Sequence, residues 1–121
     1  MYKHLISSPA ERAEILTRER TCILEELNDP AVPGVSLARA RVAPGVTTEW
    51  HSLSVTEWYV ITSGCGLMHV GDEDPFEVTA GDSVEIPAGI PQRIENRGSD
   101  DIVFRCICMP RFTIDCYTPL E

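Results

Sequence analysis

The sequence predicts an all-β fold in a single domain, and two observations support that prediction. Short segments rich in β-branched and aromatic residues run through most of the chain, and such residues are enriched in strands. Turns containing glycine or proline separate these segments at intervals of roughly eight to twelve residues, as in a sandwich or barrel. A chain of 121 residues buries one core. We therefore expect one domain over 1–121, with an N-terminal arm and strand over 1–34, a core over 35–110 and a tail over 110–121.

The N-terminal arm begins with a helix signal. Ser8, Pro9 and Glu11 stand at the positions that favour an N-cap, a first helical residue and a third helical residue. This pattern predicts a short helical turn. A strand is expected over residues 21–27, ended by Pro30 and by the Pro33–Gly34 pair.

Alternating polarity predicts the next strand, over residues 35–42. Ala38, Ala40 and Val42 share one face, whereas Arg39 and Arg41 lie on the other, which we interpret as solvated. By the same reasoning, further strands are expected over 47–53, 56–62, 66–70, 76–79, 83–86, 92–95 and 102–109. The less regular tail is expected to pack over the barrel.

Composition excludes several classes of protein. A net charge of −9 and a pI near 4.7 repel phosphate backbones, so we expect no nucleic-acid partner. No apolar run approaches the roughly 20 residues that span a bilayer, and the N-terminus lacks the apolar stretch of a secretory signal. The five cysteines form no CxxC pair, which argues against a disulfide framework. These features predict a cytoplasmic protein without a membrane partner.

Two motifs with regular spacing stand in the middle of the chain. The first consists of Gly45, His51, Leu53, Glu57 and Gly64; the second consists of Gly81, Pro87, Gly89, Gln92 and Asn96. In spacing, the two motifs resemble both halves of the cupin signature. The resemblance covers roughly residues 35–110 and implies a jelly-roll β-barrel.

The resemblance also implies a metal site inside the barrel. Metal-bearing cupins hold divalent iron, manganese, nickel, copper or zinc with three histidines and a glutamate, leaving coordination positions open for substrate or oxygen. Two of these ligands, His51 and Glu57, are present here, whereas Leu53 and Gln92 stand where the family has histidine. His51, Glu57 and Gln92 are therefore the candidate metal ligands, and any divalent transition metal is expected to bind weakly.

Strand alternation predicts which side chains share the interior. His51, Glu57, Tyr59 and Gln92 are expected to converge there. The first two are the candidate catalytic residues, and Tyr59 is a candidate for contact with a bound cofactor or ligand. Three interpretations of this group stay open: a weak metal site, a metal-free acid–base pair, or a hydrogen-bonded polar cluster in an apolar barrel.

Two cysteines add a further alternative, because Cys106 and Cys108 share one face of their expected strand. We interpret them as small buried hydrophobic residues. The alternative is that they are thiols facing the pocket, or soft metal ligands that replace a missing histidine.

Three functions are consistent with the sequence. The first is a cupin that binds a small molecule at a reduced, weakly metal-binding site. The second is a metal-dependent dioxygenase or isomerase that uses His51, Glu57 and Gln92. The third is a non-enzymatic sensor or a structural dimer. A homodimer is expected in each case, since cupins often pair through sheet edges and exposed edges must be covered.

Overall fold

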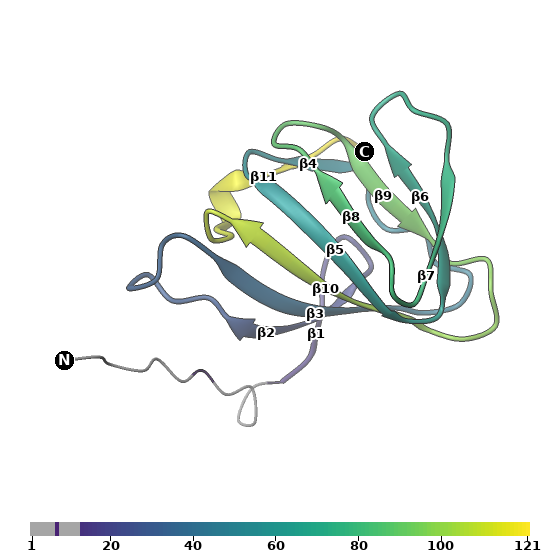
Figure 1. The fold of residues 1–121 in the computed structure, drawn as a ribbon, viewed down its shortest axis with the longest axis horizontal. Coiled ribbons are helices and arrows are strands. Elements are labelled where there is room, and N and C mark those ends of the chain that lie inside the picture. The colour runs from purple at the N-terminus through teal and green to yellow at the C-terminus, as the bar shows by residue number, and fades with distance from the viewer. Residues whose placement is uncertain (1–6, 8–12) are drawn as a thin grey trace.

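The computed structural model describes Ser7 and residues 13–121. It is all-β, as predicted, and Figure 1 shows its strands wrapped into a jelly-roll barrel. The expected helical turn over residues 8–11 lies outside the described residues. Within the described residues, no helix is long and apolar enough to cross a membrane.

The strands follow one another with short connections. In chain order they are β1 (Ile15–Leu16), β2 (Cys22–Leu27), β3 (Ser36–Val42), β4 (His51–Leu53), β5 (Thr56–Ser63), β6 (Cys65–Val70), β7 (Phe76–Thr79), β8 (Ser83–Ile86), β9 (Gln92–Glu95), β10 (Ile102–Met109) and β11 (Tyr117–Pro119), with a 3₁₀ turn, η2 (Ile114–Cys116), before the last.

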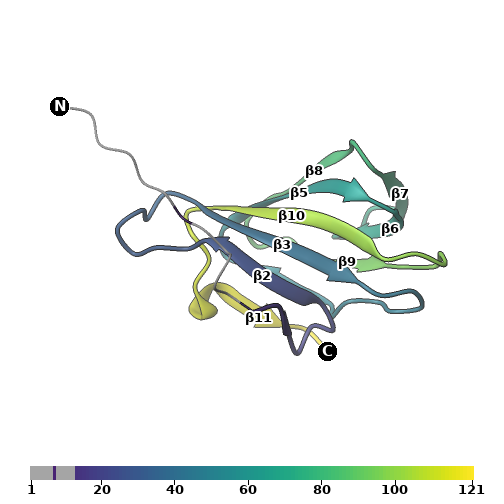
Figure 2. The ribbon, with the colours of Figure 1, turned by 90° about the horizontal axis from the view of Figure 1, so that it is seen from below.

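These strands form two antiparallel sheets. The larger sheet has the order β1-β2-β3-β10-β5-β8, and the smaller has the order β11-β4-β9-β6-β7. Figure 2 shows β2, β3 and β10 side by side across one face of the molecule. The order interleaves strands that are distant in sequence, as a jelly roll requires.

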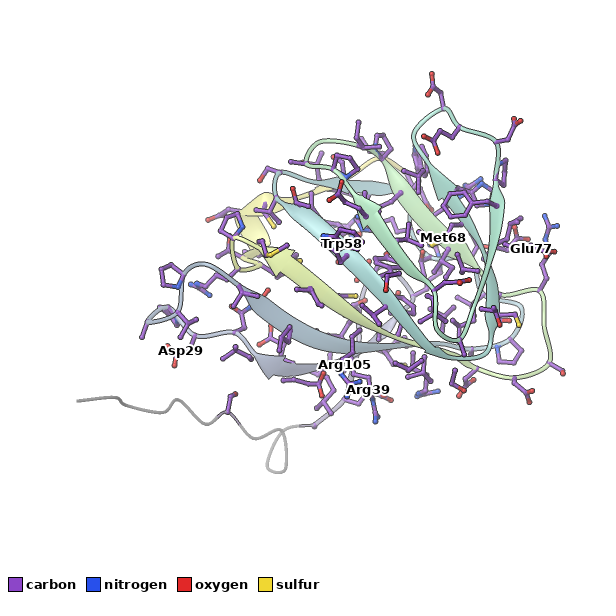
Figure 3. The ribbon with its side chains drawn as sticks, in the orientation of Figure 1. Asp29, Arg39, Trp58, Met68, Glu77 and Arg105 are labelled. Carbon is purple, nitrogen blue, oxygen red and sulfur yellow. The ribbon has the colours of Figure 1, made fainter. Side chains whose placement is uncertain are left out.

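The core lies between the two sheets, because alternate residues of each strand point inward. Met68 of β6 and Ile94 of β9 come from the smaller sheet, and both are fully buried. They meet residues of the larger sheet such as Ile61 and Phe104, which are also buried. Met68 is labelled in Figure 3. This cluster holds the two sheets together by removing apolar surface from water.

The outer face of β3 and β10 carries arginines. Arg39 and Arg105 are direct cross-strand neighbours and are labelled in Figure 3. Two like charges in this position destabilise a sheet unless acidic groups pair with them. Arg105 pairs with Glu26 at 2.9 Å, and Arg39 lies 3.7 Å from Glu14. The predicted outward orientation of the β3 arginines agrees with these positions.

The turn between β5 and β6 requires glycine for two steric reasons, a positive φ and a close approach to neighbouring backbone. Gly64, between β5 and β6, has φ +83°, and a Cβ there would lie 2.4 Å from the carbonyl oxygen of Asp101. A side chain at residue 64 would therefore be strained and would also clash. The first motif thus ends on a residue that the fold itself needs.

The structure departs from the predicted strands at β1, β4 and β11. The strand expected over 47–53 is shortened to β4, because Thr47 makes an isolated bridge to Glu95 and the amide of Glu49 bonds instead to Glu19. β1 and β11 are additional strands. They are too short to show a period in sequence, and they form by pairing with β2 and β4.

Candidate functional site

A cavity of about 560 Å³ is lined by residues of β1, β2, β3, β5, β10, η2 and β11. Figure 1 shows where these elements lie in the barrel. Ile23, Ala38 and Phe112 contribute apolar wall to it, and Glu19 and Glu57 contribute carboxyl groups. A smaller cavity of about 30 Å³ shares both carboxyl residues with it and is also lined by His51, Leu53 and Tyr59. We call the larger space the mouth cavity.

Glu57 lies on the inner face of β5 and is 6% exposed. One carboxylate oxygen, Oε1, accepts a hydrogen bond of 2.7 Å from Nε2 of Gln92, and the other lies 3.8 Å from the Cys108 thiol. Burial raises the pKa of Glu57 to about 7, and these neutral donors offset part of that rise. Near neutral pH the group is therefore poised to gain or lose a proton.

The His51 ring is held by its backbone surroundings. Nδ1 lies 2.6 Å from the carbonyl oxygen of Glu49, which can only accept, so Nδ1 carries the proton. The ring stacks on Tyr117 with centroids 4.7 Å apart. In the neutral ring Nε2 then has a free lone pair, and it lies 3.6 Å from a carboxyl oxygen of Glu19. Burial lowers the pKa of His51 and so favours that neutral form.

Glu19 reaches the site from the turn between β1 and β2. The turn is fixed against the barrel: the Glu49 amide donates to the Glu19 carbonyl at 3.0 Å, and Nε of Arg20 donates to the Thr47 carbonyl at 2.8 Å. Arg20 also pairs with Glu121 at the other end of the chain. The pKa of Glu19 is raised to about 7 by burial and by repulsion from Glu57 and Glu49.

A second carboxyl group missed by the sequence analysis lies beside His51. Glu49 is buried, accepts a short hydrogen bond from the hydroxyl of Tyr117, and lies 3.3 Å from Arg18. No spacing rule marks Glu49 or Glu19, since neither belongs to the two motifs. Tyr117 belongs to the unpredicted β11.

The structure brings most of the predicted site residues together. His51 and Gln92 are direct cross-strand partners, and Gln92 is hydrogen-bonded to Glu57. Tyr59 is buried, stacks on Phe104 at 4.4 Å, and belongs to the apolar core. Its role in ligand contact stays a prediction, and so do the catalytic roles.

The two cysteines of β10 differ in position. Both line the mouth cavity, and Cys106 also lines the smaller one, whereas Cys108 also packs in an apolar cluster with Leu53, Val55 and Cys116. Burial raises the pKa of both thiols, so they are neutral side chains near pH 7. In this form they add soft, largely apolar surface to the wall.

The donor set does not fit the metal site that the resemblance implies. Leu53 cannot ligate, and Gln92 turns its amide nitrogen, a donor, toward Glu57. The described residues contain no group of three histidine, cysteine, aspartate or glutamate side chains placed to hold a metal ion. The buried oxygen of Gln92 has no hydrogen-bond partner among them.

Comparison with known proteins identifies the family. The model of the cupin domain matches residues 38–108. The chain belongs to the cupin family. An uncharacterized protein of Methanocaldococcus jannaschii, MJ1618, is 36% identical to this cupin over 101 residues, covering 81% of the chain and 80% of that relative.

Solved structures agree with this assignment. A conserved protein with a double-stranded β-helix domain from Klebsiella pneumoniae matches with a TM-score of 0.77 at 17% identity, covering 98% of the chain and 99% of that structure. A predicted oxalate decarboxylase from Thermotoga maritima matches with a TM-score of 0.76 at 22% identity, covering 88% and 99%. These identities establish a shared fold alone.

An oxalate decarboxylase from Bacillus subtilis matches with a TM-score of 0.74 at 25% identity, covering 91% of this cupin. The cupin spans only 30% of the length of that enzyme.

Proposed function

We propose that this cupin binds a small, largely apolar molecule in the mouth cavity and that binding requires no metal. The observation that supports the proposal is the cavity itself. Its volume of about 560 Å³ lies in the range of small-molecule sites, which combine apolar walls with a few polar groups. Here Ile23, Ala38 and Phe112 are the walls, and Glu19 and Glu57 are the polar groups.

Filling the cavity tests this proposal. Ala38 lines the cavity, so Ala38→Phe should place a ring in the space a ligand would occupy. The matched control is Ala80→Phe, at an exposed turn position. With 2-phenylethanol as the probe, calorimetry should detect binding to the natural chain and to the control but not to Ala38→Phe. Equal binding to both variants would contradict the proposed site.

The metal-dependent dioxygenase or isomerase remains the alternative from sequence. It would need His51, Glu57 and Gln92 as ligands, and Gln92 offers an amide nitrogen to Glu57 in place of a ligating oxygen. We propose that any metal in purified protein is weakly bound and substoichiometric. Elemental analysis of untagged protein after dialysis against a mild chelator measures this. A full complement of metal in every chain would contradict the proposal.

Metal-free proton transfer is the second candidate function. Nε2 of His51 faces the Glu19 carboxyl at 3.6 Å while Nδ1 is fixed by the Glu49 carbonyl. An oriented imidazole beside a carboxyl group can move a proton to or from a bound molecule. Exchange of the α-hydrogens of cyclohexanone in heavy water, followed by NMR, tests this. We expect His51→Gln to slow the exchange, and an unchanged rate would exclude His51 as the base.

A homodimer is proposed on the exposed edge of the larger sheet. β1 is an edge strand, and its residues Ile15 and Leu16 are 64% and 70% exposed. Such an edge is a site for pairing with another chain. Light scattering during size-exclusion chromatography measures the mass directly. We expect a dimer that Leu16→Lys weakens, and a monomer at all concentrations would refute it.

A further inference from the structure

The mouth cavity is unbalanced in charge. Glu19, Glu25 and Glu57 line it, and the single lysine or arginine among the described residues that line it is Arg18. The Arg18 side chain is 66% exposed and pairs with the buried Glu49. The Arg18 guanidinium therefore faces water and already has a buried carboxylate partner.

Neither Glu19 nor Glu57 is paired with a lysine or arginine among the described residues. Glu57 accepts from the amide of Gln92 and lies beside the thiol of Cys108, and both of these are neutral donors. Among the described residues, the ion-pair contact of Glu19 is with His51, at 3.6 Å. The other ring nitrogen of His51, Nδ1, is already used by a backbone carbonyl. The two carboxyl groups therefore retain free acceptor capacity toward the cavity.

A charge buried in an apolar space is stable only when paired and hydrogen-bonded. A primary ammonium group supplies both, since it has three donors and a positive charge. A carboxylate ligand would place a third negative group beside Glu19 and Glu57, which already repel each other. The apolar walls at Ile23 and Phe112 suit a hydrocarbon body. An aromatic ring is accommodated easily, because an apolar cavity of about 150 Å³ already binds benzene.

We infer that the molecule bound in the mouth cavity is an apolar amine, with its ammonium group at Glu19 and Glu57 and its hydrocarbon body against Ile23 and Phe112. This inference rests on the proposed function, because it names the class of ligand for the same cavity. It also assigns Glu19 a specificity role, although this residue lies outside both sequence motifs.

Three probes with the same aromatic body test the inference: 2-phenylethylamine as the cation, 2-phenylethanol as the neutral analogue and 3-phenylpropionate as the anion. Calorimetry at neutral pH compares their affinities for the full chain. The amine should bind about tenfold or more tightly than the alcohol, and the acid about tenfold or more weakly, since one charge pair at a largely apolar site accounts for such ratios.

Substitutions at Glu57 and Glu19 test whether these carboxyl groups produce the preference for the amine. Glu57→Gln keeps the size of the side chain and the acceptor for Gln92 but removes the charge, so the preference for amine over alcohol should fall to about threefold or less. Glu19→Gln gives a second test on a turn rather than in the sheet and should reduce the preference in the same way. Glu77→Gln, exposed on β7, is the control and should leave all three affinities unchanged.

The outcomes separate this inference from the proposed function. If the alcohol binds as tightly as the amine, or the acid binds most tightly, the inference is wrong and the cavity remains a binding site. If the variants fold but keep the full preference for the amine, the amine does not contact these carboxyl groups and the inference is again overturned. If none of the three probes binds, the proposed function fails together with it.

Discussion

Replacement of Glu57 by glutamine should make the stability of this cupin less dependent on pH. The carboxyl group is 6% exposed, and its pKa rises from 4.5 to about 7 in the folded chain. The folded state therefore holds this proton to higher pH than the unfolded state does. The stability that the proton provides is complete below about pH 4.5 and is lost as the pH rises to about 7.

The magnitude follows from the shift. A rise from 4.5 to about 7 at about 1.4 kcal/mol per unit corresponds to about 3 kcal/mol of stability lost across that range. Glutamine resembles the protonated acid and cannot ionise, so the variant does not lose this contribution. The difference in unfolding free energy, Glu57→Gln minus natural chain, should increase by about 3 kcal/mol between about pH 4.5 and pH 8.

Urea unfolding at a series of pH values measures this difference. Comparing the two chains cancels the titrating groups that Glu57 does not affect, including His51, whose lowered pKa gives stability that increases with pH. The pKa of Glu19 falls in the variant because repulsion from Glu57 is removed, and this change reduces the pH dependence further in the same direction. The control is Glu77→Gln, at an exposed position labelled in Figure 3. Its curve should run parallel to that of the natural chain. A parallel curve for Glu57→Gln would mean that Glu57 titrates as it does in the unfolded chain, and the burial argument would be wrong.

Three further changes test the fold and the placement of the site. Gly64→Ala should destabilise in urea by about 2 kcal/mol more than Gly81→Ala, because both glycines have positive φ but a Cβ meets backbone at 2.4 Å only at residue 64. Met68→Ala should lower the unfolding free energy by about 2–5 kcal/mol, since the side chain is fully buried. A smaller decrease would mean that neighbouring side chains move to fill the space. Leu53→His with Gln92→His should raise the melting temperature when nickel or manganese is added; no metal-dependent rise would show that these positions do not converge.

Most of the barrel could be predicted from sequence because its strands alternate and its turns carry glycine and proline. The register of the two motifs also predicts an inner surface with His51, Glu57 and Gln92, and the structure places all three side chains in the interior. Local patterns are sufficient here, because the side chain of each strand residue points to a face fixed by its position.

Other parts of the site could not be predicted, because they depend on contacts between distant segments. Glu19 lies between two arginines, and such a charged run is normally solvated. Its side chain turns inward because its backbone docks against Glu49, which is thirty residues away. Tyr117 reaches His51 only because β11 pairs with β4. Neither contact leaves a period or a spacing in the sequence.

Segments outside the predicted strands of the motifs therefore supply polar groups around His51, namely Glu19 and Tyr117. The motif strands carry one imidazole, His51, and one carboxyl group, Glu57. The other two ligand positions of metal-bearing cupins are Leu53 and Gln92, so no complete ligand set holds a metal ion beside Glu57. The N-terminal turn then adds the Glu19 carboxyl group, and Arg20 and Glu121 pair to hold that turn against the last residue. The inferred amine binding follows from this combination, because two ligand positions without histidine and the added Glu19 carboxyl group favour a positively charged ligand. A cation that arrives with the ligand would complete the electrostatic balance that a bound metal provides in other cupins.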